Sequence, residues 1–161
     1  MPRTIPGDLD GRTFRIAVLV ARWNAEITDR LRDGALEVLA AAGVADVTVV
    51  EVPGTFELPV AAARLAATGR FEAIVALGCV LKGETIHDRV IADACAKGLM
   101  DVATGTRVPV TFGVVTADTR AQADARSDLA SAPGKGGHKG REAAEAAVRL
   151  LDALRKVEGR P

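Results

Sequence analysis

Residues Ile74 to Ile91 read IVALGCVLKGETIHDRVI and contain the pattern of a strand, a glycine loop and a helix. Ile74 to Leu77 is an apolar run without polar alternation, which is typical of a strand buried on both faces of a parallel sheet. We expect Gly78 to end that strand and Lys82-Gly83 to open a turn. From Ile86 to Met100 the apolar residues recur at helical spacing and predict a helix. The residues expected on its inner face are Ile86, Val90, Ile91, Ala94, Cys95, Gly98 and Leu99.

The loop between this strand and this helix is a candidate anion site. Backbone N–H groups and the positive end of the helix dipole would converge near Gly83, Glu84 and Thr85, which favours a phosphate. His87 follows in the first helical turn, and an imidazole with a pKa of about 6.5 suits proton transfer beside an anion. Most α/β proteins contain such a joint, however, and a histidine at a helix start is often only a surface residue, so both interpretations stay open.

Strands and helices alternate along the rest of the chain. The other expected strands are Arg15 to Ala21, Val47 to Val52 and Val108 to Val115. The other expected helices are Glu26 to Ala42, Glu57 to Thr68, a short one ending near Ala125, and Arg141 to Val157, the last preceded by a loop from Ser131 to Gly140. Four strands, each followed by a helix, imply right-handed crossovers. The sequence therefore predicts an α/β fold: a three-layer α/β/α sandwich, flavodoxin-like, with a four-stranded parallel sheet flanked by helices.

Composition and charge limit the domain count and the partners. Prolines and glycines among charges in Met1 to Arg12 predict an N-terminal arm before a single domain over residues 13–161. Lys and Arg number 21, as do Asp and Glu, so no basic surplus favours nucleic acid. No apolar run is long enough to cross a membrane. Cys79 and Cys95 lack the spacing of a zinc site, and we expect them to be reduced and buried in a cytoplasmic protein without a metal.

Three aromatic residues lie in or just after the expected strands. Trp23, the only tryptophan, is followed by Asn24; Phe56 is followed by Glu57; and Phe112 lies within the fourth strand. Packing in a core is the commoner role of such residues. A flat apolar face beside a hydrogen-bonding group also suits a polar heteroaromatic ligand, so ligand stacking is the alternative.

Taken together, four segments resemble one enzyme family. They are Arg22-Trp23-Asn24, the run PGTFELP from Pro53 to Pro59, the run ALGCVLKGET from Ala76 to Thr85 with His87, and Lys139-Gly140 with Glu142-Ala143-Ala144. Their order and spacing from Arg15 to about Arg155 resemble lumazine synthase, the penultimate enzyme of riboflavin biosynthesis. The resemblance implies a transferase that condenses 5-amino-6-ribitylaminouracil with 3,4-dihydroxy-2-butanone 4-phosphate to 6,7-dimethyl-8-ribityllumazine, without a metal or organic cofactor.

The resemblance also implies roles for residues in the loops that follow the first three strands. Trp23 would stack on the pyrimidine, and backbone groups of Val80 and Leu81 would bind the uracil edge. The remaining substrate contacts would come from Asn24, Phe56 and Glu57 around the ribityl chain, from Gly83, Glu84 and Thr85 at the phosphate, and from Thr55 and Lys82.

Two catalytic residues and a shared site are implied in the same way. His87 matches the proton-transfer histidine of the family, and Arg126 matches its phosphate-binding arginine. Phe112, Arg126 and Lys139 would come from a neighbouring subunit, with Lys135 as the alternative to Lys139. The partners expected are therefore the two small substrates and further copies of the chain, in a homopentamer or an assembly of pentamers.

Several points stay open from the sequence. Asp88 either orients His87 or simply occupies the first helical turn, where acidic residues are favourable. His138 is expected to face solvent. The link Ser127 to Gly136 is longer than in many family members, which favours a pentamer that assembles no further. A non-catalytic flavin- or lumazine-binding shell protein and an archaeal-type riboflavin synthase are the alternative functions on the same scaffold.

Overall fold

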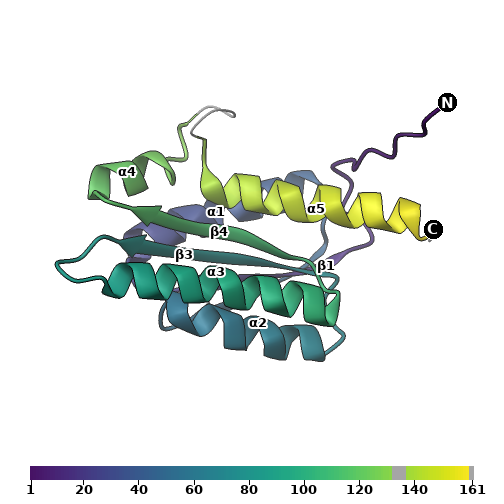
Figure 1. Ribbon diagram of the computed structural model, residues 1–161. Coiled ribbons are helices and arrows are strands. Elements are labelled where there is room, and N and C mark those ends of the chain that lie inside the picture. The colour runs from purple at the N-terminus through teal and green to yellow at the C-terminus, as the bar shows by residue number, and fades with distance from the viewer. Residues whose placement is uncertain (132–136, 160–161) are drawn as a thin grey trace.

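The computed structural model describes residues 1–131 and 137–159, which form one layered α/β unit around a parallel sheet (Figure 1). The strand order is β2-β1-β3-β4. The strands are β1 (Arg15–Ala21), β2 (Asp46–Val52), β3 (Ala73–Leu81) and β4 (Val110–Ala117). The helices are α1 (Ala25–Ala41), the 3₁₀ helix η1 (Thr55–Glu57), α2 (Leu58–Ala67), α3 (His87–Thr106), α4 (Arg120–Ala125) and α5 (Lys139–Val157).

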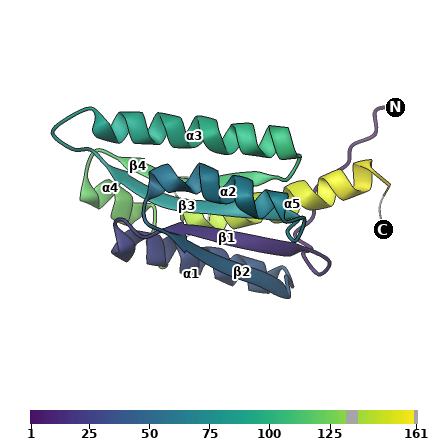
Figure 2. The ribbon, with the colours of Figure 1, turned by 90° about the horizontal axis from the view of Figure 1, so that it is seen from below.

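Helices cover both faces of the sheet. Figure 1 shows α1 and α5 on one face and α2 and α3 on the other, and Figure 2 shows the second face from below. Alternate residues of the central strand β1 therefore enter two different cores: Val18 packs with Leu31 and Val148, whereas Leu19 packs with Leu58 and Leu99. The predicted three-layer, flavodoxin-like fold is confirmed. None of the helices in the described ranges is long and apolar enough to cross a membrane.

The third strand is longer than predicted, because it continues through Gly78 to Leu81. The expectation that Gly78 ends the strand is wrong. A Cβ at Gly78 would lie 2.8 Å from Oγ1 of Thr55 and 3.3 Å from a methyl carbon of Leu58, so the glycine marks a close approach of η1 and α2 to the sheet. This close approach brings the chain after β2 against the carboxyl half of β3.

The predicted helix faces are only partly correct within one chain. Helix α3 extends to Thr106, beyond the expected end at Met100, and two residues expected on its inner face, Val90 and Ala94, are exposed. Ile86, which precedes the helix, is exposed as well, and so is Leu154 on α5. An apolar stripe indicates burial against some partner, and in the described chain these residues have no such cover.

The last helix begins at Lys139, two residues earlier than predicted, so Gly140 is helical and not part of the loop. The expectation that His138 faces solvent is also wrong, since its side chain is only 3% exposed. Its ring packs on Gly34 of α1, and its Nδ1 accepts a hydrogen bond from the backbone N–H of Arg141 at 3.2 Å. His138 is therefore the N-cap of α5. Residues 132–136, including Pro133 and Lys135, lie outside the described ranges.

The segment around Asp8 is bonded to α5, whereas Phe14, directly before β1, is buried in the core that α1 and α5 cover. The backbone N–H of Asp8 donates to the buried carboxylate of Asp152 at 2.7 Å, and Nζ of Lys156 lies 2.6 Å from the Asp8 carboxylate. Hydrogen bonds from Lys156 and Asp8 hold the pKa of Asp152 below its ordinary value. The charge of Asp152 therefore fixes this segment along the last helix.

Candidate active site

The loops after β1 and β2 lie side by side at the carboxyl edge of the sheet, where parallel α/β folds place their ligands. The backbone N–H of Arg22 donates to the carbonyl oxygen of Val52 at 2.8 Å, and that of Trp23 donates to Pro53 at 3.0 Å. The side chains of Trp23 and Phe56 are 73% and 58% exposed. Core packing, the commoner role of such aromatics, is therefore not their role within this chain.

Asn24 links this pair of loops to β3. Its backbone has φ of 61°, a left-handed conformation that asparagine tolerates better than most residues. Its side-chain Nδ2 donates to the carbonyl oxygen of Cys79 at 3.0 Å. The position of Trp23 is thus fixed by its own backbone hydrogen bond to Pro53 and by the hydrogen bond of the next residue, Asn24, to β3.

Thr55 is buried where η1 meets the sheet, whereas Phe56 beside it is exposed. The Thr55 hydroxyl is directed toward Gly78, and Oε2 of Glu57 lies near Gly54 at the start of η1. The short 3₁₀ turn therefore presents Phe56 and Glu57 at the edge while Thr55 anchors it. Thr55, which was expected to contact a substrate, is therefore buried under the turn that carries Phe56 and Glu57.

The loop after β3 is open, as a phosphate loop would be. Residues 82–87 are exposed, and Ile86 at the N-cap of α3 has no side chain that accepts a hydrogen bond. The backbone N–H of His87 donates to Oγ1 of Thr85 at 3.3 Å. Asp88, half-buried in the first turn, makes no hydrogen bond to His87 in the described residues. The positive end of the α3 dipole therefore lies beside a polar loop that solvent can reach.

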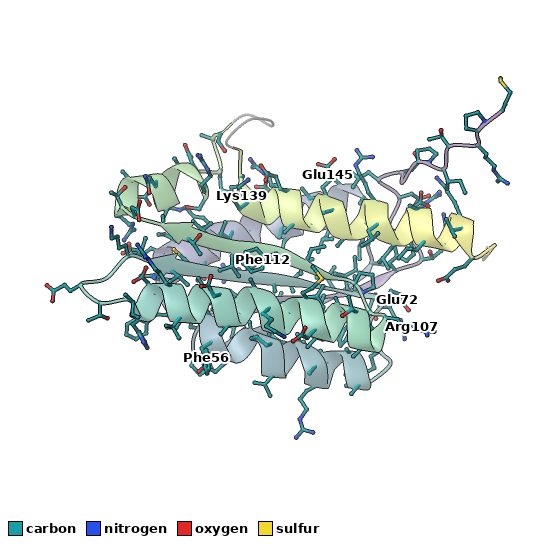
Figure 3. The ribbon with its side chains drawn as sticks, viewed as in Figure 1. Phe56, Glu72, Arg107, Phe112, Lys139 and Glu145 are labelled. Atoms are coloured by element: carbon teal, nitrogen blue, oxygen red, sulfur yellow. The ribbon has the colours of Figure 1, made fainter. Side chains whose placement is uncertain are left out.

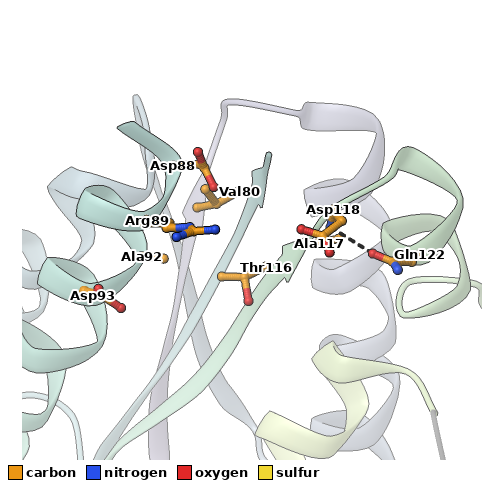
Figure 4. A pocket seen from close by; sticks show the side chains of 9 residues that line it. All are labelled: Val80, Asp88, Arg89, Ala92, Asp93, Thr116, Ala117, Asp118 and Gln122. Carbon is orange, nitrogen blue, oxygen red and sulfur yellow. Dashed lines mark hydrogen bonds between the residues drawn. The ribbon is translucent and has the colours of Figure 1, made fainter. Parts of the chain in front are cut away.

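Two adjoining grooves flank the carboxyl end of β4. The first, of about 360 Å³, lies between α3 and β4 (Figure 4). Its lining side chains are Val80, Asp88, Arg89, Ala92, Asp93, Thr116, Ala117, Asp118 and Gln122. The second, of about 430 Å³, shares Thr116, Ala117 and Gln122 and adds Arg126. Most of these residues were missed by sequence reasoning, because Thr116 and Gln122 belong to no motif.

The structure brings Arg126 and Lys139 together. Arg126 is the C-cap of α4, and its carbonyl oxygen accepts from the backbone N–H of Lys139 at 2.8 Å. Nζ of Lys139 lies 2.6 Å from a carboxylate oxygen of Glu142. Helix α4 itself starts at a capping box formed by Thr119 and Gln122. Two of the three residues expected to serve a neighbour are therefore joined through their backbones.

Phe112 lies far from the open loop of its own chain. It pairs with Ala76 in the middle of β3, whereas the loop begins after Leu81, which pairs with Ala117. Five residues of strand correspond to roughly 16 Å. Phe112, labelled in Figure 3, is the third of the eight residues of β4, and its side chain is 48% exposed. The predicted site is thus divided between a loop group, at the ends of β1, β2 and β3, and an edge group on β4, α4 and α5.

Comparison with known proteins identifies the family. Residues 13–155 match the family profile described as 6,7-dimethyl-8-ribityllumazine synthase. The chain belongs to this lumazine synthase family. A lumazine synthase of Kineococcus radiotolerans is 49% identical over 96% of this chain and 93% of its own length. That of Thermococcus gammatolerans is 42% identical over 97% of both chains, and that of Salinibacter ruber 44% identical over 99% of this chain and 100% of its own.

Family membership confirms the predicted enzyme class and reaction. Lumazine synthases are transferases of riboflavin biosynthesis, and the condensation of the ribitylaminouracil with butanone phosphate is the activity of the family. The matched relatives span nearly the whole chain, so both the loop group and the edge group lie within the shared region. Nothing in these comparisons favours a non-catalytic shell protein or a riboflavin synthase.

Proposed function

We propose that this lumazine synthase builds each active site from two neighbouring subunits. One subunit supplies the loop group: Trp23, Asn24, Phe56, Glu57, Val80, Leu81, the loop from Lys82 to Thr85, and His87. The other supplies the edge group: Phe112, Arg126 and Lys139. The observation that carries the proposal is the register of Phe112 with Ala76, which leaves this exposed aromatic about five strand residues short of its own loop.

The loop group suits the aromatic substrate. Trp23 and Phe56 offer exposed apolar faces that can cover a pyrimidine ring and its ribityl chain. Backbone groups at Val80 and Leu81, at the end of β3, provide donors and acceptors for the uracil edge, and Glu57 provides an acceptor for ribityl hydroxyls. Substrate selection in this proposal rests on stacking plus a few hydrogen bonds.

The phosphate substrate requires the two groups to meet. The open loop at Gly83, Glu84 and Thr85 supplies backbone donors at the N-terminus of α3, and Arg126 of the neighbour supplies a permanent charge with bidentate geometry. Lys139 adds a second cation once it exchanges Glu142 for the phosphate. Together they stabilise the anion as it leaves the four-carbon substrate.

His87 supplies the proton transfers. The pyrimidine amine adds to the ketone, water and phosphate leave, and the ring closes, so protons must be taken and returned near neutral pH. His87 is exposed at the start of α3, beside the phosphate loop. Holding the two reactants together removes a large entropic barrier, so His87 assists a reaction that positioning already favours.

The shared site implies a closed ring, and we propose separately that the protein is cytoplasmic. A heterologous contact leaves no subunit unsatisfied only if the ring closes, and a homopentamer is the closure that we propose. The apolar residues exposed on α3, among them Val90 and Met100, are available for such contacts. Cys79 and Cys95 are free and buried, and burial raises the pKa of each thiol to about 11, which suits a reducing compartment.

Light scattering combined with activity tests this proposal. Purified protein should have a mass near five times that of the 16.7 kDa chain and should form a fluorescent lumazine from the two substrates. Dilution into monomers should abolish the reaction together with the ring. A fully active monomer would overturn the shared site, whereas a mass near sixty chains would keep it and show that the rings assemble further.

A further inference from the structure

Helix α4 is too short to position Arg126 by itself. It has six residues, from Arg120 to Ala125, and Arg126 follows as its C-cap. Isolated helices of this length are unstable, so their orientation depends on contacts with the rest of the fold. Besides packing on β4 and β3, α4 is bonded by side chains of α1 across the end of the sheet.

Arg30 of α1 bonds a residue that precedes Arg126 in the chain and a residue that follows it. Its NH2 group pairs with the Asp124 carboxylate, and its Nε donates to the Ser127 hydroxyl oxygen at 3.2 Å. Ser127 is completely buried, and its hydroxyl donates to the carbonyl oxygen of Ala123 at 3.1 Å. The planar guanidinium therefore bonds two side chains, one two residues before Arg126 and one directly after it.

A second ion pair supports the same helix. Arg120 at the start of α4 lies 2.5 Å from the Glu26 carboxylate of α1 and 3.2 Å from Asp124. The hydrogen bond from Arg30, joined by that from Arg120, holds the pKa of Asp124 below its ordinary value, so Asp124 stays ionised. Without Arg30 this carboxylate would be less neutralised, two residues from Arg126.

We propose that Arg30 is a positioning residue for phosphate binding. By bonding Asp124 and Ser127, it fixes the position of the chain on either side of Arg126. By pairing with the Asp124 carboxylate, it also keeps that carboxylate from competing with the substrate phosphate for Arg126. The proposal rests on the proposed function of Arg126. It does not require Arg30 to stabilise the fold, because the Arg30 and Asp124 side chains are 35% and 42% exposed and pairs so exposed contribute little to stability.

The test compares Arg30→Met with a matched control, Arg32→Met. Arg32 lies on the same helix, and its ion pairs, 2.8 Å each, are with Asp29 and Asp33 of α1 itself. Arg30→Met should lower kcat/KM for butanone phosphate by about 10- to 100-fold, since a displacement of about 1 Å costs that much. The KM for the pyrimidine substrate and the thermal unfolding midpoint should not change. Arg32→Met should behave like the wild type in every measurement.

Binding of inorganic phosphate gives a second readout that a purely structural role would not move. Its inhibition constant against butanone phosphate should rise in Arg30→Met, and Arg30→Lys should recover only part of the loss, because an ammonium cannot bond Asp124 and Ser127 in the same fork. An unchanged inhibition constant in Arg30→Met would overturn the proposal. A loss shared equally by both substrates and by the Arg32→Met control would overturn it as well.

The double variant Arg30→Met/Arg126→Ala separates this proposal from the one on which it rests. If Arg30 acts through Arg126, the double variant should be no worse than Arg126→Ala alone. A further loss of similar size would overturn the route through Arg126. Normal phosphate binding in Arg126→Ala would overturn the assignment of Arg126 and the role of Arg30 together, whereas weak binding there with normal binding in Arg30→Met would overturn only the latter.

Discussion

The hydroxyl oxygen of Thr55 lies 2.8 Å from the point that a Cβ on Gly78 would occupy, so η1 rests directly on the carboxyl half of β3. This contact determines how far Phe56 and Glu57, the next residues of η1, stand above the sheet. A glycine in the middle of a buried strand is thus a requirement of the site as well as of packing.

Gly78→Ala should therefore disturb both stability and substrate binding. The added methyl group overpacks the contact with the β-branched Thr55 and should lower the free energy of unfolding by about 1 to 3 kcal/mol. It should also raise the KM for the pyrimidine substrate. Gly105→Ala is the control, because a Cβ there meets nothing within 4 Å and a helical alanine should add roughly 0.5 to 1 kcal/mol. Urea unfolding and steady-state kinetics check both.

Arg126→Ala should reduce turnover more than His87→Ala does. Arg126 is proposed to supply the permanent charge for phosphate, and removing such a donor costs roughly two to three orders of magnitude. Initial rates at subsaturating butanone phosphate are the measurement. Near-normal turnover of Arg126→Ala under that condition would mean that another cation, for example Lys139, binds the phosphate.

Trp23 substitutions should affect binding without affecting stability. Because the indole is 73% exposed, Trp23→Ala should change the free energy of unfolding by no more than about 0.5 kcal/mol. Pyrimidine binding should weaken by about 1 to 3 kcal/mol in Trp23→Ala and only slightly in Trp23→Phe, since stacking requires a flat apolar face. Equal pyrimidine affinity in all three proteins would exclude stacking on Trp23.

His138 should make stability depend on pH. Burial against α1, reinforced by the charge of Arg141, lowers the pKa of His138 below its ordinary value of 6.5, although backbone hydrogen bonding and, to a smaller extent, the charge of Glu37 oppose the shift. As the pH falls below 6.5, His138 binds a proton in the unfolded chain, whereas in the folded chain it stays neutral to a lower pH. The stability that neutral His138 contributes is therefore present above pH 6.5 and is lost as the pH falls, by at most about 1.4 kcal/mol per pH unit.

His138→Asn provides the comparison, because asparagine keeps an N-cap acceptor but does not titrate in this range. Between about pH 7.5 and about pH 5.5, the wild type should lose more free energy of unfolding than the variant. Equal losses in urea unfolding at the two pH values would show that His138 does not carry this dependence.

The sheet, and the position of the loop segments at one edge of it, could be predicted from the sequence because both depend on local patterns. Apolar runs such as Arg15 to Ala21 specify buried parallel strands, and the loop motifs lie at strand ends, which converge at one edge in this topology. Gly78 was misjudged because a glycine that accommodates a neighbouring helix looks the same in sequence as one that ends a strand. His138 was misjudged for a similar reason, since Gly34, which makes room for its ring, lies 104 positions earlier.

The edge group was the harder part. Val90, Phe112 and Leu154 are apolar but exposed in the single chain. Apolar periodicity predicts that such side chains are buried, but it does not indicate whether they pack against their own chain or against another copy. The contact of Arg30 with Asp124 and Ser127 could not be predicted either, because it joins residues more than 90 positions apart that belong to no motif.

Subunit complementation tests the shared site most directly. One variant, Trp23→Ala/His87→Ala, carries lesions only in the loop group, and the other, Arg126→Ala, carries one only in the edge group. Each should be nearly inactive alone. In rings reassembled from an equal mixture, about one quarter of the sites should combine an intact loop group with an intact edge group, so about a quarter of the wild-type activity should return. If each site instead lay within a single chain, every site would keep a lesion and mixing would restore no activity.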